Sequence, residues 1–151
     1  MIAAGASAKS AISEGFQTNG IAGVDSAAAA ISKGSSTAPI SKYVESISSP
    51  STVTGAAVAA ADAAAVTGII TLTTTADASL PTDAKQKTIV LVPYVTAADD
   101  GTAASLAAGQ EGSIQWACLT STNVQAKTRF PALATTITAD LPAKYAPSEC
   151  R

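Results

Sequence analysis

Two cysteines, Cys118 and Cys150, constrain the fold of this chain most strongly, because the second is the penultimate residue. The segment between them contains three prolines and no clear periodicity, and such a C-terminal segment frays unless something attaches it to the fold. Two arrangements are open: two buried free thiols, or a disulfide. We favour the disulfide, because closing a loop of about 33 residues stabilises a fold by roughly 3.7 kcal/mol in the chain-entropy account. A disulfide would require an oxidising compartment for folding.

The apolar core available to the chain is thin. Of its 71 apolar residues 35 are alanine, and Val, Ile, Leu and Phe together number 29 of 151. Such a share, about 19%, lies at the border of disordered compositions, but those compositions also carry a high net charge. The net charge here is only −2. The composition therefore predicts one folded domain with a small core.

Composition and motifs disfavour several functional classes. The charge of −2 and a pI of about 4.9 disfavour a strongly basic nucleic-acid binder. The chain has no histidine, and two cysteines cannot form a four-thiolate zinc site. It has no nucleophile elbow, no Gly-rich phosphate loop and no clustered carboxylates. We therefore expect no enzymatic activity, no catalytic or metal-binding residues and no cofactor.

Two helices are predicted near the N-terminus. Residues 3–18 are rich in alanine and place Ala8, Ile12 and Phe16 on one apolar stripe. Asn19-Gly20 is a stop signal, because both residues tolerate positive φ angles. A second short helix is predicted over 26–33, with Asp25 or Ser26 as its N-cap, Lys33 in its last turn and Gly34 after its end.

The remaining chain favours strands. Partial alternation or apolar runs predict them at 43–47, 68–75, 87–93 and 113–118, and an Ala-rich loop or brief helix lies between the first two at 51–65. No helical crossover fits between the last three strands, so the sheet is expected to be antiparallel. The predicted fold class is α+β: an N-terminal helix packed on one face of a meander sheet of about four strands, followed by a C-terminal disulfide-closed loop.

Three surface features each have two interpretations. The basic residues Lys127, Arg129, Lys144 and Arg151 are either a contact patch for DNA phosphates, other anions or a receptor, or a solvated loop edge. Asp99-Asp100-Gly101 with Glu111 is either a calcium loop or, as we favour, a hydrophilic turn. Trp116 beside Cys118 is interpreted as a buried structural indole rather than a redox site.

Six short segments in the same order resemble signatures of type IV pilins, with the last typical of the type IVa class. They are 13–15 (SEG), 42–47 (KYVESI), 68–73 (GIITLT), 91–93 (LVP), 114–118 (IQWAC) and 141–151 (LPAKYAPSECR). In such pilins a Pro/Lys/Tyr/Pro/Cys tail is bridged to a Trp-x-Cys strand, which implies the pair Cys118–Cys150. The resemblance implies a single domain at 1–151, divided into a helical part (1–34), an αβ-loop region (35–67), the sheet (68–118) and the disulfide-bounded loop (118–150).

The resemblance also implies a function. A type IVa major pilin is a fibre subunit whose copies stack helically through the N-terminal helix, with the sheet and the loop outside. It implies an extracellular pilus of a Gram-negative bacterium, an inner-membrane anchor before assembly, and an assembly machinery that drives polymerisation and retraction. Twitching motility and surface adhesion follow, with surfaces, phage or DNA as further partners and DNA uptake as an open question.

The family's cleavage site and its Phe-Thr-Leu-Ile-Glu start, with the assembly glutamate, do not occur here. We therefore expect the chain to begin near the middle of the pilin helix, to be soluble and not to assemble by the native route. Two alternatives of the same fold remain. One is a minor pilin or DNA-uptake receptor, and the other is a pseudopilin of type II secretion, which would require bound calcium.

Overall fold

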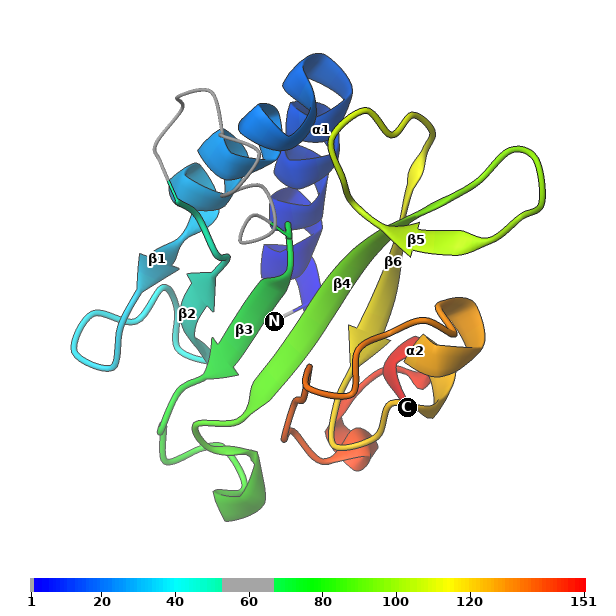
Figure 1. The fold of residues 1–151 in the computed structure, drawn as a ribbon. Helices are drawn as coiled ribbons and strands as arrows, with labels where there is room; N and C mark the ends of the chain where they lie inside the picture. The colour runs from blue at the N-terminus through cyan, green and yellow to red at the C-terminus, as the bar shows by residue number, and fades with distance from the viewer. Residues whose placement is uncertain (1, 53–66) are drawn as a thin grey trace.

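In the computed structural model, which describes residues 2–52 and 67–151, a long helix packs against one face of an antiparallel sheet (Figure 1). This helix, α1 (Ile2–Ile31), buries the predicted stripe of Ala8, Ile12 and Phe16 against the sheet. The predicted break is confirmed, because Asn19 and Gly20 leave helical geometry and Gly20 has a φ of 58°. The Ala-rich loop or helix expected at 51–65 lies, except for its first two residues, outside the described part of the chain.

The prediction of a second helix over 26–33 is wrong at both ends. Helical structure resumes directly after the break and ends at Ile31, and Lys33 belongs to a strand. Asp25 is not an N-cap: it is buried inside the helix, where its Oδ1 accepts hydrogen bonds from the Ser51 hydroxyl at 2.8 Å and the Thr52 N–H at 2.7 Å. Asp25 fails to cap the helix because a tertiary contact takes its carboxylate: it binds residues 51 and 52, far along the chain, instead of the helix's own first turn.

The two halves of α1 cross at a pair of glycines, Gly15 and Gly23. A methyl group on either residue would overlap the carbonyl of the other, so only glycine permits this backbone contact. The turn at Asn19-Gly20 brings the two positions together, and the second half of the helix runs back toward the sheet (Figure 1).

We expect Gly23→Ala to lower the free energy of unfolding by about 2 kcal/mol, because overpacking forces the half-helices apart and outweighs the better helix propensity of alanine. Urea denaturation measures this. Gly5→Ala, also in α1, is the control: its methyl group would meet only the movable ends of Leu72 and Leu91, at 3.0 and 3.1 Å. A Gly23→Ala variant as stable as the parent chain would contradict the close crossing.

The described residues form one six-stranded antiparallel sheet. Its strands are β1 (Lys33–Gly34), β2 (Val44–Ser48), β3 (Ile70–Thr74), β4 (Thr88–Thr96), β5 (Ala103–Ser105) and β6 (Ile114–Leu119). The four predicted strands are confirmed as β2, β3, β4 and β6, and the short strands β1 and β5 were not predicted. β4 is central: Leu91 pairs with Ile70 of β3 on one edge and with Cys118 of β6 on the other.

β4 continues three residues beyond the predicted end at Pro93. On one edge the pairing with β3 stops at Leu91 and the pairing with β5 starts at Tyr94, so Pro93 has no partner there. A proline, which has no N–H to donate, is tolerated at such a gap. The strand therefore crosses the whole sheet with all seven residues from Ile89 to Val95 buried.

Both faces of the sheet are covered, whereas the sequence predicted a cover for one. Ile89, Leu91 and Val95 pack in the core that α1 shares. Val90, Val92 and Tyr94 pack on the other face against a second layer. That layer contains the helix α2 (Val124–Arg129) and the chain that follows it. Three short 3₁₀ helices complete the fold: η1 (Thr82–Ala84), η2 (Ala143–Tyr145) and η3 (Ser148–Cys150).

Candidate functional site

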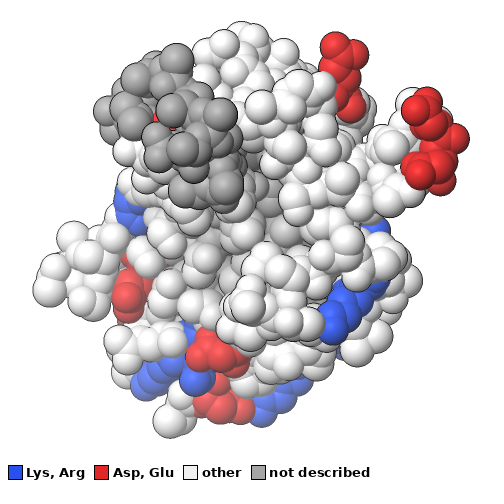
Figure 2. All heavy atoms as spheres, in the orientation of Figure 1, with Lys and Arg blue, Asp and Glu red and all other residues white. Residues whose placement is uncertain are grey.

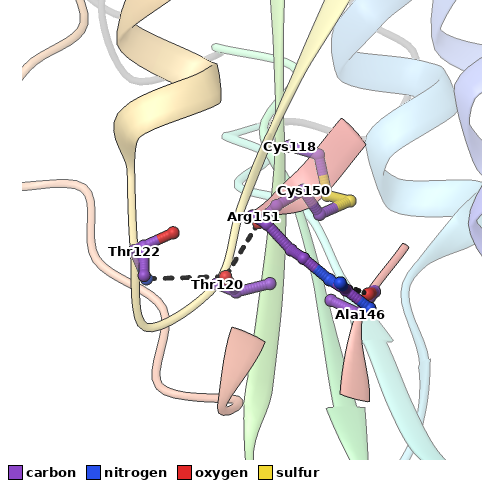
Figure 3. Close-up of a disulfide and its surroundings, with 6 residues drawn as sticks. All are labelled: Cys118, Thr120, Thr122, Ala146, Cys150 and Arg151. Carbon is purple, nitrogen blue, oxygen red and sulfur yellow. Dashed lines mark hydrogen bonds between the residues drawn. A yellow bond between two sulfur atoms is a disulfide. The ribbon is translucent and has the colours of Figure 1, made fainter. Parts of the chain in front are cut away.

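A disulfide joins Cys118 of β6 to Cys150 of η3, as predicted, with the two Cα atoms 4.7 Å apart (Figure 3). Both cysteines are buried. We call the segment 118–150 the cystine loop. The bridge connects the end of a sheet strand to the last turn of the chain, so the cystine loop includes the whole second layer of the fold.

Hydrogen bonds beside the disulfide bind the last residues to the chain directly after β6 and to one another. The Thr120 hydroxyl donates to the Cys150 carbonyl at 2.8 Å, and the Arg151 Nε donates to the Ala146 carbonyl at 2.9 Å (Figure 3). Further back, the Ser121 N–H donates to the Leu141 carbonyl at 2.8 Å. The C-terminal end is thus held by polar contacts as well as by the covalent bond.

Apolar side chains anchor the middle of the cystine loop. Phe130 is 2% exposed and its ring stacks on Tyr94 of β4 with centroids 5.3 Å apart. Ala126 of α2 and Leu133 are buried in the same cluster. This layer was not predicted from the sequence, although Asn123 before the helix and the four-residue spacing of Ala126 and Phe130 are a helical signal.

Asp140 holds the cystine loop to the start of β4. Its Oδ1 accepts from the Thr88 N–H at 2.6 Å and the Thr88 hydroxyl at 2.8 Å, and its Oδ2 pairs with Lys87 Nζ at 3.2 Å. Partial burial raises the pKa of Asp140, but the hydrogen bonds from Thr88 and Lys87 lower it more, so the net pKa lies below the ordinary 3.8. The carboxylate is therefore ionised at neutral pH.

We expect Asp140→Asn to lower the free energy of unfolding by about 1 kcal/mol at pH 7, a modest value because solvent screens this exposed site. The pKa is lower in the folded state than in the unfolded state. The stabilisation is therefore present above about pH 4 and is lost as the pH falls through the folded-state pKa. Urea denaturation should show a larger difference from the parent chain at pH 7 than near pH 2.5. Asp99→Asn, at an exposed loop position, is the control; a difference as large in acid as at pH 7 would contradict this account.

A second contact joins η2 to η1. Lys144 Nζ lies 2.6 Å from Asp83 Oδ2, and the Tyr145 hydroxyl donates to Asp83 Oδ1 at 2.8 Å. Lys144 also lies over the Tyr145 ring at 4.8 Å from its centroid. The hydrogen bonds from Lys144 and Tyr145 hold the pKa of Asp83 below its usual value, and Asp83 raises the pKa of Lys144.

The four predicted basic residues lie on α2, on η2 and at the C-terminal residue Arg151. Lys127 and Arg129 are exposed on α2, Lys144 is paired with Asp83, and Arg151 bonds to a carbonyl. Figure 2 shows blue and red side chains interspersed over the lower part of the visible face. Lys144 and Arg151 are engaged by the contacts described above, so of these four residues only Lys127 and Arg129 remain available to a partner.

The remaining predicted site residues have structural environments. Asp100 accepts the Thr102 N–H at 2.9 Å in the turn between β4 and β5, and this bond lowers its pKa. Among residues 2–52 and 67–151, no group of three His, Cys, Asp or Glu side chains converges as a metal site requires. Trp116 is only partly buried, so the expectation of a buried indole is wrong in degree; it borders a hollow beside the disulfide. Within the described part of the chain, no helix has both the length and the apolar character needed to cross a membrane.

The sequence and the fold both match those of bacterial filament proteins. The chain matches the family model described as pilin, a bacterial filament protein, over residues 1–151, so it belongs to the pilin family. A crystal structure of the type IV pilin of Pseudomonas aeruginosa strain Pa110594 is similar, with a TM-score of 0.70 and 30% identity over 99% of this chain and 92% of that one. No curated protein sequence matches the chain.

These findings confirm the resemblance to type IV pilins and the predicted architecture of helix, antiparallel sheet and C-terminal disulfide. The chain is a pilus subunit, and its role is structural rather than enzymatic. Type IV pilins assemble from copies of themselves into extracellular bacterial pili.

Proposed function

We propose that this pilin is the major subunit of a type IVa pilus that supports twitching motility and surface adhesion. The observation that carries the proposal is the cystine loop, fastened to the sheet by the disulfide, by Phe130 and by the Asp140 and Asp83 contacts. A subunit that transmits mechanical load needs its outer layer attached at several points. One methionine and a single disulfide also suit a surface exposed to oxidants.

The mechanism is mechanical. Copies stack helically through the N-terminal helix, and the sheet with the cystine loop forms the outer surface. Before assembly the subunit is held in the inner membrane of a Gram-negative bacterium, and a separate assembly machinery adds and withdraws subunits. Surfaces and phage would then meet the cystine loop, in which Lys127 and Arg129 are exposed and outside the ion pair that Lys144 forms with Asp83.

Deleting the gene in its source bacterium tests this proposal. We expect electron microscopy to show loss of the fibres, and we expect twitching zones to disappear; the wild-type gene should restore both. The double variant Lys127→Gln, Arg129→Gln is the control for assembly and should restore fibres while reducing attachment to anionic surfaces. Fibres in normal number after the deletion would contradict a major subunit and favour a minor pilin.

A minor pilin or DNA-uptake receptor is the second candidate, and the exposed cations on α2 favour it. A duplex-DNA mobility shift that weakens steeply with salt would support this role. No shift at low salt would remove it. No aromatic side chain of α2 offers a base-stacking surface, because the neighbouring Phe130 is buried.

A further inference from the structure

A hollow of about 210 Å³ lies beside the disulfide, where α1, β4, β6, α2 and η3 meet. We call it the disulfide pocket. Its apolar wall is formed by Leu91, by the Cys118–Cys150 bridge and by Trp116. Leu91 and both cysteines are buried, whereas the indole is only partly buried and so keeps accessible surface at the wall.

Three charged side chains from three elements border the disulfide pocket: Lys9 of α1, Arg129 of α2 and Glu149 of η3. The ion pairs among the described residues are Lys87–Asp140 and Lys144–Asp83, so these three side chains form none with each other. The border thus carries two cations and one carboxylate, an excess of one positive charge. A neutral or cationic guest would leave that excess uncompensated.

We propose that the disulfide pocket binds a small organic carboxylate built on a six-membered ring. Arg129 and Lys9 are the donors for the carboxylate, since a guanidinium matches a carboxylate with two parallel hydrogen bonds. Trp116 offers an indole to the face of the ring. The volume lies below the 300–1,000 Å³ of sites for drug-sized ligands and suits roughly a dozen non-hydrogen atoms.

Two sources share this chemistry: an aromatic carboxylate and a uronic acid. Benzoate and glucuronate are the corresponding probes. A ligand of this size binds with a dissociation constant on the order of 1 mM. Trp116 is the single tryptophan of the chain, so its indole N–H gives one recognisable signal in a proton–nitrogen NMR spectrum.

The test is a titration of the nitrogen-labelled chain with each probe at constant ionic strength, following the Trp116 indole signal. We expect a saturable shift with at least one probe and none with glucose or benzyl alcohol, their neutral counterparts. A shift with benzoate alone would identify an aromatic carboxylate as the ligand, and a shift with glucuronate alone would identify a uronic acid. Shifts with both probes would show that the pocket recognises the carboxylate and ring that they share. No saturable shift with either probe, or equal shifts with the neutral compounds, would overturn the proposal.

Variants test the assigned residues. Arg129→Gln should weaken binding by about fivefold or more, because it removes the two charge-assisted hydrogen bonds from the guanidinium to the carboxylate. Glu149→Gln should strengthen binding by roughly twofold, because it removes a like charge at the border. Lys127→Gln, two residues from Arg129 on the same helix but outside the pocket, is the control and should bind as the parent chain does. Dispersed amide signals show that each variant is folded, and an Arg129→Gln variant with unchanged affinity would refute the assignment.

Discussion

The double variant Cys118→Ser, Cys150→Ser is expected to unfold with a free energy about 3.7 kcal/mol lower than that of the parent chain. The disulfide closes a loop whose ends are 32 positions apart in sequence, and without it the unfolded chain gains the entropy of that loop. Urea denaturation under oxidising conditions measures the difference. The sequence alone predicts that the whole tail becomes mobile, but the contacts of Phe130 and Asp140 restrict the expected mobility to the last turns.

Reduction provides the matched control for this variant. Adding a thiol reductant to the parent chain should lower its stability to that of the double variant and should leave the double variant unchanged. Hydrogen exchange should accelerate most at Cys150 and Arg151, whose N–H groups bond within η3. A parent chain whose urea midpoint does not move on full reduction would show that the bridge contributes nothing to stability.

Phe130→Ala should lower the free energy of unfolding by about 4 kcal/mol. The ring is 2% exposed, belongs to the largest fully buried side chains described, and stacks on Tyr94 of the central strand. Its removal leaves a cavity between β4 and the cystine loop, and the disulfide prevents that loop from collapsing freely onto the sheet. The cost therefore combines lost apolar burial with a cavity that cannot fully close.

Val124→Ala, at the start of the helix α2 that Phe130 follows, is the control for Phe130→Ala. Val124 is 64% exposed, so its truncation should change the stability by less than about 0.5 kcal/mol. Both variants should keep the disulfide, which mass spectrometry after alkylation checks. Equal stabilities of the two variants would mean that the second layer of the fold does not depend on its aromatic anchor.

The sequence by itself determined the elements whose signals are local. The stripe of Ala8, Ile12 and Phe16, the break at Asn19-Gly20 and the apolar run of β4 each depend on periodicity or on backbone freedom within a few residues. The pairing of Cys118 with Cys150 was also predictable, because two cysteines allow a single intrachain bridge and the fraying tail supplied the reason for it.

Only the tertiary structure decided the features that depend on residues far apart in the chain. Asp25 suggests a helix cap until its partners at Ser51 and Thr52 are known, and Pro93 suggests a strand end until the gap between β3 and β5 is seen. The second layer formed by α2 was not predicted because six residues are too few to show a clear helical pattern. A helix of this length is also unstable in isolation. The stability of α2 comes from packing on β4. The charges around the disulfide pocket likewise converge only after three separate elements have folded together, because no local interaction brings these charges near one another.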